Sequence, residues 1–277
     1  MKLIYFFLCI QLVSATLEGM SLSTSVIQHA GSRRFLEDYY IDTDLQDKSR
    51  IIGVLDGHGG DGHGGYEAAL FAQENLPTNI ENDQFAINIP TAITAGFLKT
   101  HQDFIAEFPE QKRTGTTALI SIIKDSLLYI ANLGMSRAVL VNKAGTIITE
   151  TSDHKPGFDP DHAKKVPLGY ISNYNGTPRV CGHLSVTRAL GDAYLEKYLL
   201  QNPDVTTHQI SEDTNFLILA SNGIWHHISS PDLAQKFHEK LQTNDNLDAI
   251  TSHIMDSIPK TGDDQTLMIV KFNHLKP

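Results

Sequence analysis

Four segments of the sequence place acidic residues, or an amide, at the ends of apolar runs. They are Glu37-Asp38, Asp56, Asn222 and Asp263-Asp264. An apolar run predicts a buried strand, so each of these side chains is expected at the rim of a sheet. Carboxylates gathered at one rim repel one another unless cations compensate, and oxygen-only ligands suit Mg²⁺ or Mn²⁺ rather than zinc. The spacing is compatible with a cation site and also with four unrelated loop positions, since acids often flank strands.

A glycine-rich segment follows the second of these positions. Gly57-His58-Gly59-Gly60 comes directly after Asp56, and the pattern is repeated at once in residues 61–65. Glycine lets the backbone bend tightly and leaves the Gly57 carbonyl accessible enough to approach an ion. This local sequence favours the cation site over unrelated loops.

The composition limits the partners. The chain has 277 residues, 32 acidic against 22 basic, with a formal charge of −10. This charge opposes binding to nucleic acid or to anionic lipid. With 41% hydrophobic residues, the chain can bury a substantial core, and disorder, collagen and coiled coil are excluded.

The N-terminal segment resembles a secretory signal. Lys2 precedes an apolar stretch from Leu3 to Val13, which ends in the cleavage-like pattern Val13-Ser14-Ala15. We predict a signal peptide over residues 1–15, and a secretory or extracellular location if it is cleaved. Otherwise the stretch is a buried first strand or an upstream extension and the protein is cytoplasmic. The stretch is too short to span a bilayer, and we expect no membrane span elsewhere. Cleavage would leave Cys181 without a partner for an internal disulfide.

The remaining pattern predicts a single domain over residues 16–277 with alternating element types. Helical spacing predicts four helices, over Tyr66–Asn75, Pro90–Phe108, Pro231–Leu241 and Asn246–Ile258. Runs rich in β-branched residues predict eight strands: Thr24–Gln28, Arg50–Asp56, Thr116–Lys124, Ser126–Asn132, Arg137–Asn142, Thr146–Thr149, Asn215–Ser221 and Gln265–Phe272. Turn-sized breaks at Lys124-Asp125 and residues 143–145 indicate that the middle strands pair as an antiparallel meander. The fold class is therefore α+β.

Several segments, in order, resemble the metal-dependent serine/threonine phosphatases of the protein phosphatase 2C family. The resemblance runs from about Ser21 to Phe272. It rests on residues 33–38 (RRFLED), 53–60 (GVLDGHGG), 114–118 (TGTTA), 131–140 (ANLGMSRAVL), 153–156 (DHKP), 184–192 (LSVTRALGD), 217–225 and 263–266. It implies a layered sandwich of two antiparallel β-sheets flanked by α-helices.

The resemblance also implies a hydrolytic site with two Mg²⁺ or Mn²⁺ ions. Asp56 would bridge the ions, the Gly57 carbonyl and Glu37 would complete one shell, and Asp263 with Asn222 would hold the other. A water shared between the ions would attack phosphorus in line. In this scheme Arg33 holds the phosphate oxygens, His58 protonates the leaving oxygen, and Asp38 orients metal-bound waters.

Three departures from the family pattern bear on activity. Asn222 stands where the family has aspartate, so one metal site loses a negative ligand and is expected to bind more weakly. Met135 replaces a second aspartate, so a third, weaker ion is expected to be absent. The repeated glycine motif makes Asp61 and His63 the reserve assignment for Asp56 and His58, which we prefer because a strand end holds a ligand more rigidly than a glycine loop.

Two functions follow from these residues. The first is a phosphatase acting on phosphoserine and phosphothreonine in proteins, with a phosphorylated protein as its partner and a monomeric state. The second is a pseudophosphatase that keeps the fold and binds a phosphoprotein or another partner without turnover. The residues that match the family favour the first, and Asn222, Met135 and the glycine insertion favour the second.

Overall fold

The computed structural model describes residues 20–31, 36–59, 65–260 and 262–274. The expected signal segment 1–15 and the candidate residues Arg33, Asp61 and His63 lie outside the described residues. Their assignments therefore stay predictions.

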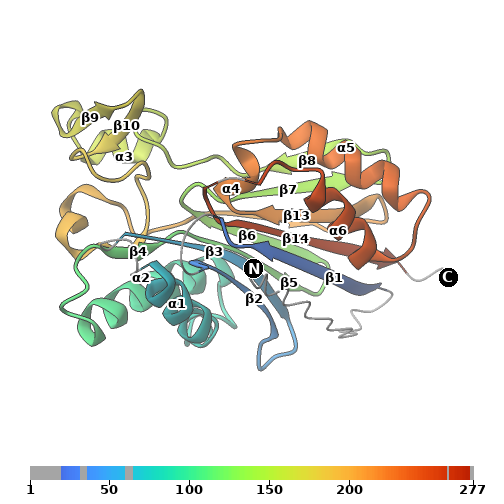
Figure 1. The fold of residues 1–277 in the computed structure, drawn as a ribbon. Coiled ribbons are helices and arrows are strands. Elements are labelled where there is room, and N and C mark those ends of the chain that lie inside the picture. The colour runs from blue at the N-terminus through green and yellow to red at the C-terminus, as the bar shows by residue number, and fades with distance from the viewer. Residues whose placement is uncertain (1–19, 32–35, 60–64, 261, 275–277) are drawn as a thin grey trace.

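Two antiparallel sheets face each other across a shared apolar core (Figure 1). The first sheet has the order β1 (Met20–His29), β14 (Gln265–His274), β13 (Thr214–Ala220), β7 (Arg137–Asn142) and β8 (Ile147–Glu150). The second has the order β11 (Leu190–Gly191), β4 (Thr114–Thr116), β3 (Arg50–Gly59), β5 (Ala118–Lys124), β6 (Leu127–Leu133) and β12 (Asp204–Gln209), with β2 (Asp38–Asp44) paired to β3. Side chains such as Val54, Leu119, Leu217 and Met268 fill the space between the sheets. This core holds the strand ends in a fixed relation.

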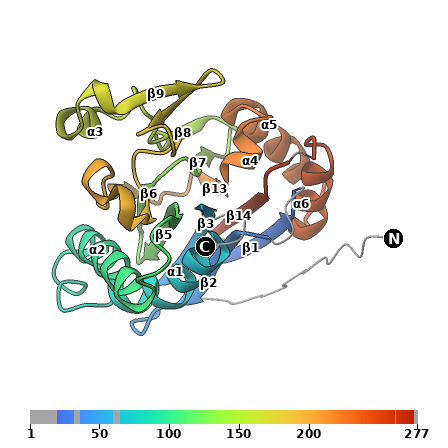
Figure 2. The ribbon, with the colours of Figure 1, turned by 60° about the vertical axis from the view of Figure 1, so that its left-hand side comes forward.

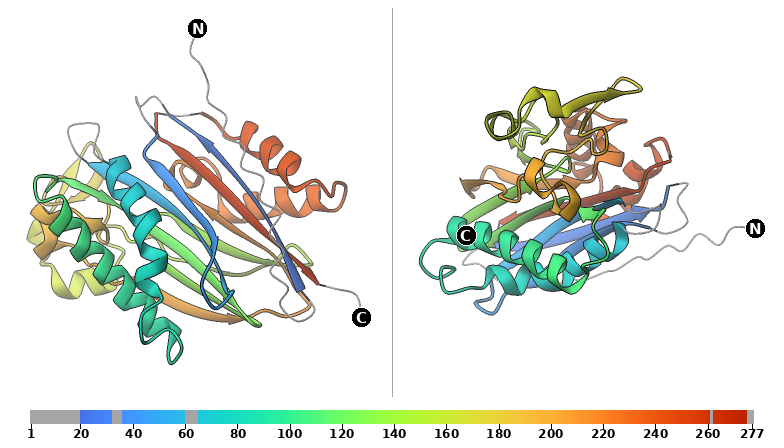
Figure 3. Two further views of the ribbon diagram at one scale, coloured as in Figure 1. Left: turned by 90° about the horizontal axis from the view of Figure 1, so that it is seen from below. Right: turned by 90° about the vertical axis from the view of Figure 1, so that its left-hand side faces the viewer.

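Helices cover the outer face of each sheet. Helices α1 (Gly65–Ile80) and α2 (Ile89–Glu107) lie on the second sheet, and α5 (Ser230–Leu241) and α6 (Leu247–Asp256) lie on the first, as the edge-on view in Figure 3 shows. A short helix, α4 (Asn222–Trp225), follows β13 directly. The predicted α+β layered sandwich is confirmed.

A smaller unit projects from one end of the sandwich, and we call residues 160–180 the flap (Figures 1 and 2). It contains α3 (Pro160–Lys165), the 3₁₀ turn η1 (Leu168–Tyr170), and the hairpin of β9 (Ile171–Tyr174) and β10 (Thr177–Val180). A second 3₁₀ turn, η2 (Ala193–Tyr198), lies next to its base. Arg188, 1% exposed, donates to both carboxylate oxygens of Asp159 at 2.8 and 3.0 Å and to Asp204 at 2.7 Å. This buried cluster fixes the base of the flap.

The structure corrects two predictions about elements. The expected helix end at Asn75 is wrong: α1 continues through Pro77 to Ile80, because Leu76 and Ile80 are fully buried in the core and hold the last turn. The single meander is also wrong. The pairs β5·β6 and β7·β8 form as expected, but β6 and β7 belong to different sheets, because the chain crosses between sheets at residues 134–136.

Strands β2 and β12 were not predicted. Their sequences, residues 38–44 (DYYIDTD) and 204–209 (DVTTHQ), are polar and partly exposed, as is typical of strands at the edge of a sheet. Within the described ranges, we find no helix that is long and apolar enough to cross a membrane.

Candidate active site

A pocket of about 590 Å³ opens between the strand ends and the flap. Asp56 and His58 reach it from the end of β3, Asn222 from the start of α4, and Asp263 from the segment before β14. The structure thus brings four of the predicted site residues to one pocket, although they are up to 207 positions apart (263 − 56) in the sequence.

The glycines at the end of β3 permit close backbone contacts. A Cβ on Gly57 would lie 2.3 Å from the Gly65 carbonyl oxygen and 2.6 Å from that of Glu37. Gly59 has a φ of +98°, and a Cβ there would lie 1.9 Å from the Arg113 carbonyl oxygen. Larger residues would push these segments apart, so the glycines set the position of Asp56 and His58.

Asp38 lies behind Asp56, directly opposite it in the β2·β3 register. Its carboxylate is 1% exposed and accepts a hydrogen bond from Thr266 Oγ1 at 2.7 Å. Burial, followed by the neighbouring carboxylates of Asp264 and Asp263, raises the pKa of Asp38 to about 7. A cation in the pocket would relieve this repulsion, so the local charge suits metal binding.

The adjacent residues Asp263 and Asp264 have different surroundings. Asp264 is buried, and its carboxylate accepts hydrogen bonds from the backbone N–H groups of Gly31 at 2.9 Å and Glu37 at 2.7 Å. Asp263 lines the pocket. The second aspartate therefore holds the segment that carries Glu37, while the first is placed to bind a ligand. Glu37 itself is buried and its backbone contacts Gly57.

Asn222 and Met135 form another part of the pocket wall. The Asn222 Oδ1 atom is buried and has no hydrogen-bond partner in the structure. Met135 is 7% exposed and belongs to an apolar cluster with Val180 and Val186 from the flap region. The Met135 side chain supplies a packing surface to the pocket, and the expected loss of a third ion site stays a prediction.

The sequence reasoning missed Asp192 as a partner of His58. His58 Nε2 lies 2.7 Å from Asp192 Oδ2, and the Asp192 carboxylate is fully buried. Asp192 adopts a left-handed backbone conformation with φ +51°, and a Cβ on Gly115 would lie 2.1 Å from its Oδ2 atom. In the sequence, Asp192 stood out only as the last residue of the 184–192 motif. No local pattern indicates a contact across 134 positions.

The donor atoms in the pocket fit an oxygen-preferring divalent cation. Asp56, Asp263 and the unpartnered Asn222 Oδ1 supply oxygen only, which favours Mg²⁺ or Mn²⁺. In the described part of the chain, however, no three His, Cys, Asp or Glu side chains gather closely enough to hold an ion by themselves. The amide at position 222 and water molecules would have to complete any coordination shell.

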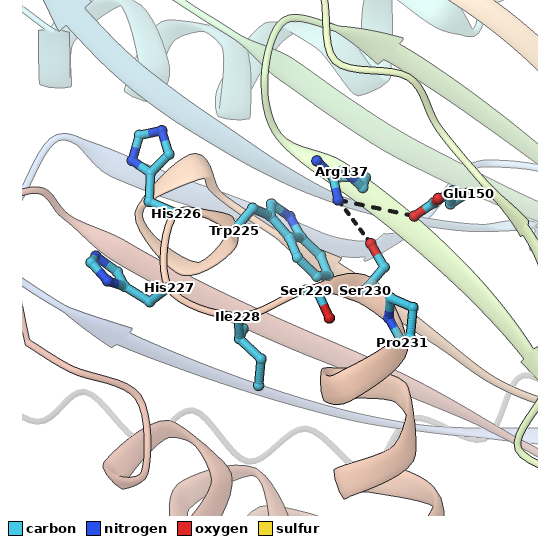
Figure 4. Close-up of a pocket in the computed structure, with 9 residues that line it drawn as sticks. All are labelled: Arg137, Glu150, Trp225, His226, His227, Ile228, Ser229, Ser230 and Pro231. Atoms are coloured by element: carbon cyan, nitrogen blue, oxygen red, sulfur yellow. Dashed lines mark hydrogen bonds and ion pairs between the residues drawn. The ribbon is translucent and has the colours of Figure 1, made fainter.

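A second, shallower pocket of about 520 Å³ lies beside α4, and His226 lines both pockets (Figure 4). Its arginine, Arg137, donates to Ser230 at 2.8 Å and lies 5.1 Å from the centroid of the Trp225 ring. Arg137 is also paired with Asp153 through two hydrogen bonds. Trp225 packs against the core under α5 and α6, and His226 and His227 are exposed.

The fold and the pocket together define a class of protein. Two facing antiparallel sheets, a helix pair on each outer face and an acid-lined pocket beside a projecting flap describe a four-layered α+β protein. Residues 24–265 match the family model described as Protein phosphatase 2C, and the chain belongs to that family.

Curated relatives and solved structures agree with this assignment. The chain is 31% identical over 262 residues to the probable protein phosphatase 2C 52 of Oryza sativa subsp. japonica, covering 92% of this chain and 51% of the relative. It is 32% identical over 264 residues to the probable protein phosphatase 2C 2 of Arabidopsis thaliana, covering 91% and 67%. The chain thus spans about half to two thirds of these relatives' length.

Two solved structures show the same fold. A serine-threonine phosphatase 2C from Toxoplasma gondii superposes with a TM-score of 0.74 at 16% identity, covering 99% of this chain and 100% of the other. A C. elegans sex determining protein superposes with a TM-score of 0.77 at 20% identity, covering 92% and 65%. At these identities the likeness concerns the fold alone.

Proposed function

We propose that the chain is a Mg²⁺- or Mn²⁺-dependent phosphatase that hydrolyses phosphoserine and phosphothreonine in proteins. The observation that carries this proposal is the shared pocket, in which Asp56, Asp263 and Asn222 lie with a histidine that is fixed by a buried carboxylate. Bound divalent cations would supply an activated water and neutralise phosphate charge. Asp56 would hold both ions, with Glu37 and the Gly57 carbonyl on one side and Asp263 and Asn222 on the other.

His58 is suited to protonate the leaving oxygen. Asp192 engages the Nε2 atom, so the other ring nitrogen, Nδ1, is the one available to the leaving group. The buried carboxylate also restricts the rotation of the imidazole ring. The two residues therefore form an acid and its positioning group.

The proposal is tested by turnover of a small aryl phosphate by the purified chain, with Mn²⁺ varied into the millimolar range. We expect metal-dependent hydrolysis in the wild type and its loss in Asp56→Asn. Asp61→Asn is the matched control, because it changes the same residue type in the repeated motif and should retain activity. Wild-type protein that binds Mn²⁺ but shows no turnover would support the pseudophosphatase hypothesis instead.

A further inference from the structure

Two cationic side chains line the same candidate pocket as the acidic residues. Lys155 and Arg179 line it on the flap side, and Asp56 and Asp263 line it on the side of the strand ends. We call Lys155 and Arg179 the flap wall. A chain with a net charge of −10 places two cations beside its candidate active site, so the wall is suited to an anionic partner.

Arg179, in β10, lacks the ion pair that three other described arginines have. Arg50, Arg137 and Arg188 each form an ion pair with an aspartate. Arg179 donates from Nη1 to the His183 carbonyl oxygen at 2.6 Å, and its Nε–H is buried without a hydrogen-bond partner. Among the described residues, it has no carboxylate within ion-pair distance.

The charge of the Arg179 guanidinium is not neutralised within the described structure. Guanidinium groups bind carboxylate or phosphate through paired hydrogen bonds. The carbonyl of His183 orients Arg179 without neutralising it. Arg179 is therefore positioned to receive an anionic group that enters the pocket.

Lys155 adds to the positive charge of the wall. Its Nζ atom lies 2.8 Å from Asp153, but Asp153 already accepts two hydrogen bonds from Arg137. One carboxylate thus faces two cations. The Lys155 side chain remains 45% exposed at the pocket, so it is accessible to a ligand.

The mouth of the pocket indicates a polypeptide ligand. Phe158 lines the pocket and is 79% exposed. An exposed aromatic side chain beside a pocket is covered more readily by a polypeptide than by a small phosphate ester. The positive wall and the apolar mouth together suit an extended segment that carries both charged and apolar side chains.

We propose that the flap wall binds a second anionic side chain of the substrate, so the protein prefers phosphorylated residues in acidic surroundings. The second anion is a carboxylate or a second phosphate close in sequence to the residue that is dephosphorylated. This inference rests on the proposed phosphatase function. It assigns Arg179 to substrate selection, separate from the residues that contact the reacting phosphate.

The test compares three phosphothreonine peptides of equal length under Mn²⁺. They carry flanking Glu residues, flanking Gln residues, or one flanking nonhydrolysable phosphonate. We expect kcat/KM for the Glu or phosphonate peptide to exceed that for the Gln peptide about tenfold, as for one charge-assisted hydrogen bond at a partly exposed site. The peptide with the larger value identifies which anion the wall prefers.

The variant Arg179→Gln should abolish this preference and leave turnover of the Gln peptide and of an aryl phosphate unchanged. Arg179→Lys should recover part of the preference. Lys164→Gln is the matched control, because Lys164 is an exposed flap cation that pairs with Asp161 and is not part of the pocket lining. Equal wild-type rates on all peptides, or an equal loss on every substrate in Arg179→Gln, would overturn the proposal.

Fluorescence anisotropy separates this proposal from the proposed function. Labelled peptides are titrated with wild-type and Arg179→Gln protein in the presence of a metal chelator, where no turnover occurs. Tighter binding of the Glu or phosphonate peptide that depends on Arg179 would support the flap wall even if the wild type hydrolyses nothing. Equal affinities of the two proteins would overturn it even if hydrolysis is fast.

Discussion

The two halves of the candidate pocket differ in charge. The half built by β3 and the segment before β14 contains Asp56 and Asp263. The buried Asp38, which accepts a hydrogen bond from Thr266, lies behind Asp56. The half built by the turn before β7 and by α4 contains Met135 and Asn222, which carry no charge. Because cation affinity depends on carboxylate ligands, one half is suited to tight binding and the other to weak binding.

The two halves of the pocket differ in packing as well as in charge. On the acidic side, close backbone contacts at Gly57 and Gly59 fix the strand end. On the other side, Met135 packs with Val180 and Val186, so this position connects the pocket to the flap.

The largest effect is expected from Asp56→Asn. This change removes the carboxylate at the centre of the acidic half, and we expect kcat for an aryl phosphate to fall by at least about 1,000-fold, as for loss of a principal charge-stabilising group. Steady-state kinetics with saturating Mn²⁺ measures it. Asn222→Ala should reduce kcat far less. An equal loss of kcat in both variants would contradict the expected difference in ion binding between the two halves.

Met135→Asp tests the packed half. The new carboxylate would be buried among Val180 and Val186, so we expect the free energy of unfolding to fall by about 2–4 kcal/mol. Urea unfolding measures this change, and Met135→Leu, which keeps volume and polarity, should cost less than about 1.5 kcal/mol. Full stability of Met135→Asp without added metal would show that this position is not an apolar contact.

Asp192→Asn tests the positioning of His58. Asparagine keeps the shape and tolerates φ of +51°, so the fold should persist while the charge is lost. We expect kcat for a phosphothreonine peptide to fall about 10- to 100-fold, within the range of general acid catalysis. An aryl phosphate with a good leaving group needs little protonation and should be much less affected.

The control for this prediction is Asp213→Asn, which changes an exposed aspartate in the turn before β13. An equal loss of activity on both substrates in Asp192→Asn would indicate a general structural defect rather than a role in leaving-group protonation.

The smallest effect is expected from Asn222→Asp. A carboxylate at this position adds charge to the weak half, so the Mn²⁺ concentration for half-maximal activity should fall about tenfold. Activity titrations and calorimetry measure the change. An unaltered metal requirement would mean that position 222 does not contribute to ion binding.

The strand rim could be predicted from sequence because it depends on local pattern. The apolar run before Asn222 indicates the end of β13 at Ala220, and the glycines after Asp56 indicate a tight approach, both of which the structure has. The predicted strand end at Asp56 is wrong, because β3 continues to Gly59 by pairing with β4. Family resemblance supplied the order of the segments. The partnership of His58 with Asp192 was not predictable, because it depends on β4, which lies between β11 and the end of β3 and pairs with both.

Other differences between the sequence prediction and the structure also arise from tertiary contacts. Pro77 would end an isolated helix, but burial of Leu76 and Ile80 keeps α1 helical beyond it. The absence of an ion pair at Arg179 is likewise not visible in the sequence, because the sequence does not show which acidic residues lie near it in the fold. Only the folded chain distinguishes it from Arg188.

The Arg188 cluster at the base of the flap closes a loop in the chain. Asp159 lies before the flap and Arg188 after it, and their buried ion pair joins the two ends as a noncovalent cross-link. The entropy of closing a loop grows slowly with its length, by about 0.6 kcal/mol for each doubling. Insertions and deletions between the two residues should therefore be tolerated by the sandwich, so the flap can vary in length while the strand rim stays fixed.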